Sequence, residues 1–394
     1  MIRKAFVGSL AGGAIGASAI AARAARSALF HGRDVPGPTF TEWIVAHQVT
    51  ANGLCRYYRF GPHAREESPL ATAYAILHLV DKEPGVARKL GNGLIALQAS
   101  SSGNRRCSGG VPSIANDDSR LYYASDALAC AEAQIALYRA THRDRYLVSA
   151  RRFIAFVRSM SDGVGAGMFV ENVGLPMQFV SWAGDYQNDV VLDGVLLFWH
   201  ALLSFAKLAG DSAARDLYER GRRFVLAKVQ APSGAFYDHY DPGYPPLPYA
   251  DSRWRFYKTE PDGRRIAVGD SMLMAALGVQ RLGGEAMVER FFRFLQPTNG
   301  AVYAYVDAAT GGPGFAAGDK PYFDIVDSAL YGVLLHRAGS ADEEQIAALR
   351  AVVKRARTKD GGYRWGRHVD GTWVQDEAEA LVTGFWAQRL LEAS

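Results

Sequence analysis

The chain has 394 residues, of which 49% are hydrophobic and 21% charged, and its formal net charge at pH 7 is +4. This composition is typical of a globular protein that can bury a core of ordinary size. The basic residues are scattered along the chain, and no block of like charge is long enough to predict nucleic-acid binding. We therefore expect a folded protein without a nucleic-acid partner.

Residues 1–30 differ from the rest of the chain. Two basic residues precede an apolar run from Ala5 to Ala22, and the first acidic residue is Asp34. Small-residue cleavage patterns follow the run, which predicts a secretory signal peptide. The run is also long enough for one membrane span, so an uncleaved N-terminal anchor is the alternative. A transit peptide is disfavoured because the segment is rich in glycine. We expect a protein that is exported, periplasmic or extracellular, or held at a membrane by its N-terminus, with residues 31–394 forming one domain.

A short element then recurs six times. Each copy has a small or polar residue, one or two small residues and an alternating apolar or aromatic run. The first glycines of the copies are 56 to 69 residues apart: Gly53, Gly109, Gly165, Gly234, Gly300 and Gly361. Self-similarity at such a period predicts a repeat architecture.

Two helical patterns lie between successive copies. The first pattern is apolar on all sides and begins at an acidic residue, which is Glu67, Asp126, Asp193, Asp270, Asp327 or Glu379. The second is amphipathic, as in residues 143–160, where apolar residues share one face and arginines the opposite one. An apolar helix that alternates with an amphipathic one predicts an inner and an outer ring.

The two ends of the repeat predict how the ring closes. An inner-type helix, Glu379 to Leu391, has no outer partner after it, and a lone helix at Phe40 to Gln48 precedes the first element. If these two helices pair, six hairpins close on themselves and leave no hydrophobic end to be capped. We therefore predict an all-α (α/α)6 toroid, a six-hairpin barrel with short β elements at its mouth.

In such a ring, all six elements and all six acidic residues line one mouth. Aspartate is a favoured N-cap residue, so capping alone could explain the acids. Two links are longer and richer in polar and aromatic residues than the rest, Val170–Asp189 and Ala231–Arg265. Long loops in compact domains are usually functional. The alternative is a surface crossover held by proline and aromatic packing.

The content of these links suits a sugar, because flat rings stack on the C–H faces of pyranoses while carboxylates, amides and imidazole bond hydroxyls. Two carboxylates flanking a glycosidic bond would hydrolyse it, whereas histidine and tyrosine suit proton transfer at C5 of a uronate. The predicted catalytic residues are Glu171, Asp185, Asp189, Asp238, His239 and Tyr240. The predicted substrate-binding residues are Tyr122, Tyr123, Trp182, Tyr186, Asn188, Tyr237, Tyr244, Trp254 and Trp365.

Other catalytic signatures are absent from the sequence, which has no G-x-S-x-G elbow, P-loop, dinucleotide fingerprint or HExxH motif. Terpenoid cyclases and prenyltransferases also use α/α toroids, but no DDxxD motif or zinc-ligand set occurs. Cys55, Cys107 and Cys130 have no metal-binding spacing; a Cys55–Cys107 disulfide and buried free thiols are the two alternatives. We expect neither a metal nor a cofactor.

The repeat resembles the six-hairpin superfamily of carbohydrate-active enzymes from Phe40 onward, with a typical inner–outer helix pair in residues 131–156. A narrower likeness, in "YYASDALACAEAQ", "VVLDGVLLFWHALL" and "SGAFYDHY", is to the C-terminal helical domain of D-glucuronyl C5-epimerases. It implies that a substrate cleft includes six residues, Tyr122, Tyr123, Asp193, Gly194, Tyr237 and Asp238. The paired-glutamate and tyrosine motif of that family is reduced to Glu171, and its β-rich domains are missing, so the likeness supports the fold and uronate-type substrates more than epimerisation.

These observations predict an enzyme that acts on a polysaccharide or oligosaccharide, with a glycoside hydrolase as the first hypothesis. A uronate C5-epimerase or polysaccharide lyase on the same fold is the second. A non-catalytic glycan-binding or assembly protein is the third, and in each case the partner is a carbohydrate.

Overall fold

A computed structural model describes residues 37–394 apart from 62, 101–102, 104, 118–119, 162–174, 182–185, 188–189, 241–253, 299–300, 317–318, 341, 375–378 and 394. The described residues belong to one unit, Gly37–Ser394. The leader predicted at residues 1–30 lies outside them and stays a prediction. Among the described helices, none is both long and apolar enough to cross a membrane.

Within the described residues the helices form six hairpins, each with an inner and an outer member. The inner helices are α3 (Pro69–Leu79), α5 (Ala124–Thr141), α7 (Asp193–Phe198) with α8 (His200–Ala209), α10 (Gly269–Arg281), α12 (Ile325–Arg337) and α14 (Leu381–Glu392). The outer helices are α4 (Pro84–Leu97), α6 (Asp144–Ser161), α9 (Ser212–Lys228), α11 (Glu285–Phe294), α13 (Glu343–Ala356) and α2 (Phe40–Trp43) with the π-helix η2 (Ile44–Gln48).

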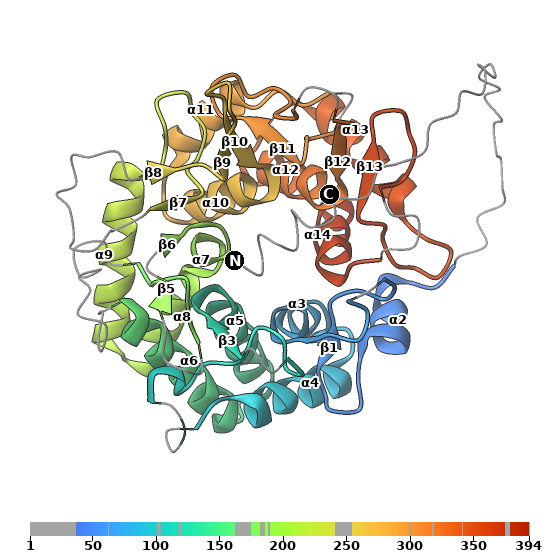
Figure 1. The fold of residues 1–394 in the computed structure, drawn as a ribbon. Coiled ribbons are helices and arrows are strands. Elements are labelled where there is room, and N and C mark those ends of the chain that lie inside the picture. The colour runs from blue at the N-terminus through green and yellow to red at the C-terminus, as the bar shows by residue number, and fades with distance from the viewer. Residues whose placement is uncertain are drawn as a thin grey trace. The chain divides into compact units, whose positions relative to one another are not determined.

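The inner helices close a ring. Contacts run from α3 to α5, from α5 to α7 and α8, from α7 to α10, from α10 to α12, from α12 to α14, and from α14 back to α3. Figure 1 shows this ring with the amphipathic helices around its outside. The inner helices are apolar on all sides because they are covered by neighbours on both sides and by an outer helix. The predicted (α/α)6 toroid is confirmed.

The first helix completes the last hairpin. Phe40 of α2 packs so closely against α14 that a Cβ on Gly384 would collide with its ring. Trp43 donates a hydrogen bond from Nε1 to Oε2 of Glu379, just before α14, at 2.7 Å. Arg59 also lies 3.3 Å from this carboxylate. Glu379 therefore ties the two ends of the ring together, which explains one of the six acidic residues in purely structural terms.

Short antiparallel strands precede inner helices and pair with the repeated elements. Two sheets have two strands each: β1 (Cys55–Arg56) pairs with β2 (Glu67–Ser68), and β12 (Tyr322–Asp324) pairs with β13 (Gly366–His368). Three sheets have three strands each. In the first, β4 (Phe179–Ser181) pairs with β3 (Leu121–Tyr123) and β5 (Tyr186–Gln187); in the second, β7 (His239–Tyr240) pairs with β6 (Val190–Val191) and β8 (Trp254–Arg255); in the third, β10 (Arg265–Val268) pairs with β9 (Lys258–Thr259) and β11 (Tyr305–Asp307). Because the strands lead into the N-termini of the inner helices, they gather at one end of the ring, called here the strand end. These are the short β elements predicted at the mouth.

The glycines of the elements have a structural role. Gly109 and Gly234 have φ angles of +87° and +102°, which residues with a Cβ rarely adopt. Each also lies so close to the backbone of the next outer helix that a Cβ would collide with a carbonyl oxygen. The side-chain amides of Gln98 and Gln230 donate to the carbonyls of these two glycines at 2.8 and 2.9 Å. The glutamine–glycine pattern therefore joins successive hairpins.

A recurring backbone hydrogen bond identifies the equivalent residues of the elements. The N–H at the start of an inner helix donates to an element carbonyl at 2.9 to 3.1 Å in five pairs: Ala124 to Gln178, Leu192 to Asp238, Gly269 to Ala304, Ile325 to Trp365, and Leu381 to Tyr57. Four acceptors follow the first glycine of their element by four positions. Gln178 does not follow Gly165 in this way, so the third element lies further along the chain than the sequence predicts. Gly165 itself is outside the described residues.

The third inner helix differs from its predicted form. The sequence predicts one continuous helix from Asp193, whereas the structure ends α7 at Phe198 and begins α8 at His200. The backbone of Leu196 lies against Gly278 of α10, where any Cβ would collide with it. The indole of Trp199 donates to the Tyr218 carbonyl at 3.1 Å. The break therefore accompanies close packing of α7 on the next inner helix.

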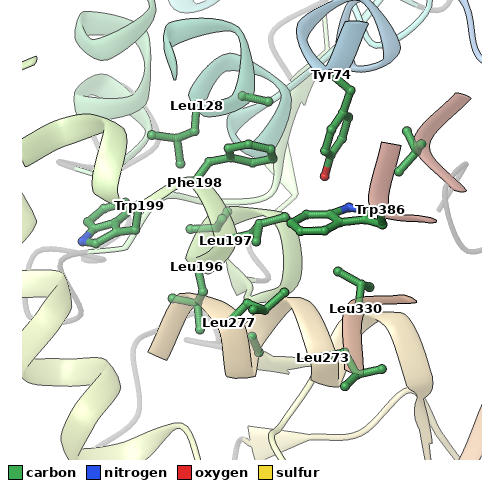
Figure 2. Close-up of a cluster of buried hydrophobic side chains, with 14 of the residues drawn as sticks. Tyr74, Leu128, Leu196, Leu197, Phe198, Trp199, Leu273, Leu277, Leu330 and Trp386 are labelled. Atoms are coloured by element: carbon green, nitrogen blue, oxygen red, sulfur yellow. The ribbon is translucent and has the colours of Figure 1, made fainter. Parts of the chain in front are cut away.

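Apolar side chains fill the ring interior below the strand end. Tyr74 of α3 lies with its ring centroid 5.5 Å from that of Phe198 and 6.2 Å from that of Trp386. Figure 2 shows these rings together with leucines of α7, α10 and α12, among them Leu197 and Leu273. Polar groups that could act on a substrate must therefore be sought at the ends of the ring.

Candidate active site

The structure describes part of the site predicted from the sequence. The side chains of Tyr122, Tyr123, Tyr237, Asp238, His239, Tyr240, Trp254 and Trp365 are described. Glu171, Trp182, Asp185, Asn188, Asp189 and Tyr244 lie outside the described residues, and Tyr186 is described only through its backbone in β5. The predicted pairing of carboxylates across the two long links therefore stays a prediction.

The aromatic residues of β7, β8 and their surroundings pack on one another and are called here the Trp254 cluster, consisting of Phe224, Tyr237, Tyr240, Trp254 and Phe256. The Trp254 ring is stacked with Tyr237 at 5.1 Å and with Phe224 at 5.6 Å, measured between centroids. Tyr240 lies 5.0 Å from the same ring and is buried. These contacts provide the aromatic packing that was the structural alternative for this link.

Asp238 and His239 are both buried and are held by the sheet of β6, β7 and β8. The backbone of Asp238 accepts from Leu192 and donates to Arg255, each at 3.0 Å. Because Leu192 immediately precedes α7, the sheet fixes Asp238 beside the start of an inner helix. Tyr122 and Tyr123 are also buried, in β3 before α5. The predicted residues of these two sheets thus lie at the strand end, as expected.

A second region of the strand end contains three carboxyls, Asp270, Asp324 and Asp327, called here the acidic group. Asp270 is the second residue of α10, Asp324 is the last residue of β12, and Asp327 is the third residue of α12. A Cβ on Gly269 would collide with the Asp327 carboxylate, and a Cβ on Gly366 would lie 3.0 Å from Oδ1 of Asp324. Glycines at these two positions allow the backbone of α10 and β13 to approach the carboxylates.

Two members of the acidic group are deeply buried. Asp327 is 0% exposed and Asp324 is 7% exposed. Within the described part of the chain, neither carboxylate oxygen of Asp327 has a hydrogen-bond partner, and Oδ1 of Asp324 has none. Burying a carboxylate without partners is costly, so the charged form is disfavoured and a ligand or a proton is expected there.

The pKa values of both carboxyls are raised well above their usual range. Burial is the main cause for each, and the neighbouring carboxyls add to it: Asp270 raises the pKa of Asp324, while Asp324 and Asp270 raise that of Asp327. Carboxyls this close to one another cannot all ionise together and titrate as a group. The acidic group therefore retains a proton at a pH where an isolated aspartate would have lost it.

Aromatic rings surround the acidic group. Tyr322 lies 6.1 Å from Tyr305 and 6.0 Å from Trp365, and Tyr257 stacks on Tyr305 at 5.8 Å. Burial raises the pKa of Tyr58, Tyr305 and Tyr322, and negative charge on Asp324 raises it further. These phenols therefore remain neutral hydrogen-bonding groups beside the carboxyls. Trp365 is half-buried here, so one predicted substrate-binding residue belongs to this second region.

The capping explanation for the acidic residues is wrong in the described inner helices. At α3 the N-cap side chain is that of Ser68, which is not one of the acidic residues. In α5, α7, α10, α12 and α14 the side chain of the N-cap residue makes no hydrogen bond to the first turn. Asp126 and Asp327 lie inside their helices rather than before them. In the sequence, Asp270 and Asp327 are recognisable only as helix starts, and Asp324 carries no signal of its own.

Metal and disulfide chemistry find no support among the described residues. No group of three or more His, Cys, Asp or Glu side chains in this part of the chain is arranged to hold a metal ion. Cys55, Cys107 and Cys130 are free and buried, so the Cys55–Cys107 disulfide is not formed. Burial raises the pKa of the Cys107 thiol to about 11, which keeps it in the unreactive protonated form.

No protein-family model matches the chain, and a search of curated proteins found no match either. Solved structures do match over most of the chain. An α-amylase from Clostridium perfringens is 10% identical with a TM-score of 0.64, covering 90% of this chain and 95% of that one. A cellobiose 2-epimerase from Bacillus thermoamylovorans is 10% identical with a TM-score of 0.64, covering 89% and 95%. An inactive variant of an α-1,6-mannanase from Salegentibacter, in complex with α-1,6-mannotriose, is 13% identical with a TM-score of 0.53, covering 90% and 96%. At these identities the likeness shows the fold, and this chain has the (α/α)6 fold that these carbohydrate-active enzymes share.

Proposed function

We propose that this protein is a carbohydrate-active enzyme that hydrolyses glycosidic bonds with the carboxyls of the acidic group. The observation that carries the proposal is the burial of Asp324 and Asp327 together, beside Asp270, at the strand end of the ring. Glycoside hydrolysis needs one protonated and one ionised carboxyl at the same pH. A group of coupled carboxyls with raised pKa values supplies both forms above the pH at which isolated aspartates have all ionised.

The different burial of the three carboxyls suggests different roles. Asp324 keeps a proton and has a small exposed area, so we assign it as the donor to the oxygen of the leaving sugar. Asp270 is half-buried, and we assign it as the base that takes a proton from the attacking water. The water oxygen then bonds to the anomeric carbon as the glycosidic bond breaks. Asp327 is fully buried against the backbone of Gly269, next to Asp270, and is assigned as a positioning residue.

Aromatic residues around the acidic group fit a sugar-binding role. Tyr305, Tyr322 and Trp365 offer rings that can stack on the C–H faces of a pyranose. The mannanase of the same fold, crystallised with mannotriose, supports a carbohydrate as the ligand class. Trp365 connects this proposal with the sequence-based prediction, because it was assigned to substrate binding on sequence grounds.

The test is turnover by matched variants on a panel of neutral and charged glycans, with released reducing ends as the readout. Asp324→Asn is expected to lower turnover by at least about 100-fold, since general acid catalysis contributes on the order of 10² to 10⁴. Asp342→Asn is the control, because Asp342 caps α13 and asparagine caps equally well. Full activity of Asp324→Asn would refute the assignment.

Sugar epimerisation is the second candidate, and one observation favours it. The phenols of Tyr58, Tyr305 and Tyr322 lie around carboxyls that can exchange protons with a sugar carbon. The cellobiose 2-epimerase of the same fold is consistent with this alternative. Uptake of solvent deuterium at a sugar carbon without release of reducing ends would establish epimerisation in place of hydrolysis.

A further inference from the structure

A second charged region lies at the end of the ring opposite the strand end. The six inner members of the hairpins all begin at the strand end, so their last turns gather at the other end, called here the helix end. Each inner member has at least one basic residue in its last turn, and these residues are His78, Arg139, Lys207, Arg281, His336, Arg337 and Arg389. Cations in a last turn interact favourably with the helix dipole, which explains each residue taken by itself.

Three of these arginines belong to successive inner helices. Arg281 of α10, Arg337 of α12 and Arg389 of α14 lie in the last turns of helices that contact one another around the ring (Figure 1). Arg281 donates to the Leu197 carbonyl of α7 at 3.0 Å and lies 4.0 Å from the carboxylate of Glu132 in α5. Because it contacts two other inner helices, the Arg281 side chain extends towards the inside of the ring.

Arg139 of α5 joins the same set. It follows Glu132 by seven residues, or two helical turns, so both side chains lie on one face of that helix. Burial raises the pKa of Glu132, and four positive charges lower it, those of Arg281, Arg139, Arg337 and Arg389. Four guanidiniums from four inner helices are therefore gathered around one carboxyl, and they are called here the arginine cluster.

The arginine cluster is accessible to a ligand. Arg139, Arg337 and Arg389 are exposed, and Arg281 is half-buried. In the described part of the chain, Arg139 and Arg337 form no hydrogen bond or ion pair. Although Arg337 is exposed, desolvation by the protein around it, together with the charges on Arg281 and Arg389, lowers its pKa to about 10. Arg337 thus stays charged at neutral pH and is repelled by its neighbours.

Carboxyls among the described residues do not balance the arginine cluster. Glu132 is one carboxyl beside four guanidiniums, and Glu392, at the end of α14, is paired with Lys82 at 2.6 Å. The helix dipole acts on each arginine separately and does not account for their gathering. Like charges held together at a surface attract an oppositely charged ligand, whose binding relieves their repulsion.

We propose that the arginine cluster binds a phosphate-bearing ligand at the end of the ring opposite the candidate active site. Guanidiniums hold phosphate oxygens through paired N–H donors in a planar fork. A phosphate group has close to two negative charges and three acceptor oxygens, so a single group contacts more than one arginine. A carboxylate, with one charge and two oxygens, compensates less of the repulsion. This inference stands independently of the proposed function.

The experiment is calorimetric titration of the full chain with pyrophosphate, and with citrate as a carboxylate probe of similar charge. We expect pyrophosphate to bind at least about tenfold more tightly than citrate, with an affinity that falls as salt screens the charges. Sedimentation with phosphatidylglycerol vesicles, compared with phosphatidylcholine vesicles, distinguishes the source of the phosphate. Retention on the anionic vesicles that pyrophosphate reverses identifies a lipid headgroup, and pyrophosphate binding without retention identifies a soluble ligand.

Matched variants locate the binding site. Arg337→Gln is expected to lower the affinity for pyrophosphate at least about tenfold, because it removes charge-assisted hydrogen bonds. Arg337→Lys keeps the charge but loses the fork, so an intermediate affinity is expected. Arg293→Gln is the control, because Arg293 is an exposed arginine in the last turn of an outer helix, α11, and its replacement should leave the affinity unchanged. Arg389→Gln provides a second variant of the cluster should Arg337→Gln fail to fold.

Three outcomes would overturn the inference. The unmodified protein could fail to bind pyrophosphate, or could bind citrate equally well. Arg293→Gln could weaken binding as much as Arg337→Gln, which would show attraction by surface charge in general. Asp324→Asn, a change at the strand end, should leave pyrophosphate binding intact; loss of binding in that variant would place the ligand at the wrong end of the ring.

Discussion

Two aromatic regions lie at the same end of the ring, and they differ in the carboxyls beside their rings: Asp238 in the first, and the coupled Asp324 and Asp327 in the second. In the Trp254 cluster the rings pack on each other, with centroids about 5 Å apart, and this packing accompanies the pairing of β7 with β8. Around the acidic group the rings lie beside buried carboxyls, two of which lack hydrogen-bond partners on at least one oxygen among the described residues. Ring packing alone therefore does not identify a sugar site, and the coupled carboxyls distinguish the second region from the first.

Neutralising one carboxyl in each region tests which of the two regions holds the active site. We expect Asp324→Asn to lower turnover by at least about 100-fold, and we expect a smaller loss for Asp238→Asn. Both variants keep the size of the side chain, so rates on the best glycan of the panel report chemistry rather than packing. A larger loss for Asp238→Asn would move the active site to the Trp254 cluster, where the sequence predicts it.

Removing one ring from each region distinguishes a packing role from a sugar-binding role. Trp254→Ala is expected to destabilise the fold by about 2–3 kcal/mol, because a half-buried indole with several ring neighbours leaves a cavity. Trp365→Ala is expected to cost about 1 kcal/mol and mainly to raise KM, because its backbone bond to Ile325 is kept. Thermal denaturation and steady-state kinetics on both variants measure the two effects. The reverse pattern would make Trp254 the sugar platform.

The sequence predicts the ring well because its signals are local and repeated. The glycine elements impose positive φ at positions such as Gly109 and Gly234, and the apolar pattern from Asp126 marks an inner helix directly. Closure through Phe40 follows from counting unpaired helices at the two ends. By contrast, the break at Trp199 accompanies packing of α7 on α10, which no local pattern encodes.

The acidic group illustrates why the site was only partly predictable. Asp270 and Asp327 were visible as helix starts, but their proximity depends on the pairing of β10 with β11 and on the bridge between Tyr303 and Phe323. Asp324 lies at the end of a three-residue strand that resembles many others in sequence. Long-range pairing, rather than residue type, makes these carboxyls neighbours.

Close approach of the backbone to the acidic group gives a further prediction. Gly269→Ala is expected to destabilise the protein by about 1–3 kcal/mol and to lower activity, because the new Cβ would collide with the Asp327 carboxylate and lie 2.6 Å from the Tyr303 carbonyl. Gly85→Ala in α4 is the control, since a Cβ there meets nothing within 4 Å. Chemical denaturation of both variants checks the difference, and equal stabilities would contradict the close approach.

The raised pKa values of Asp324 and Asp327 predict how stability depends on pH. Their pKa values are higher in the folded chain than in the unfolded chain, where aspartate titrates near about 4. The folded state therefore binds more protons above that pH, and its stability declines as pH rises from about 4 through the folded pKa values.

Asp327→Asn removes one of the coupled carboxyls, so we expect it to be more stable than the unmodified protein at pH 8, by about 1 kcal/mol. At pH 4, where the carboxyl is protonated, the two should be nearly equal. Denaturation curves across this pH range measure the effect. If Asp327→Asn is instead less stable than the unmodified protein at pH 8, with a difference that shrinks towards pH 4, the Asp327 carboxyl is ionised and stabilised in the fold, and the acidic group does not hold the proton that the proposed hydrolysis needs.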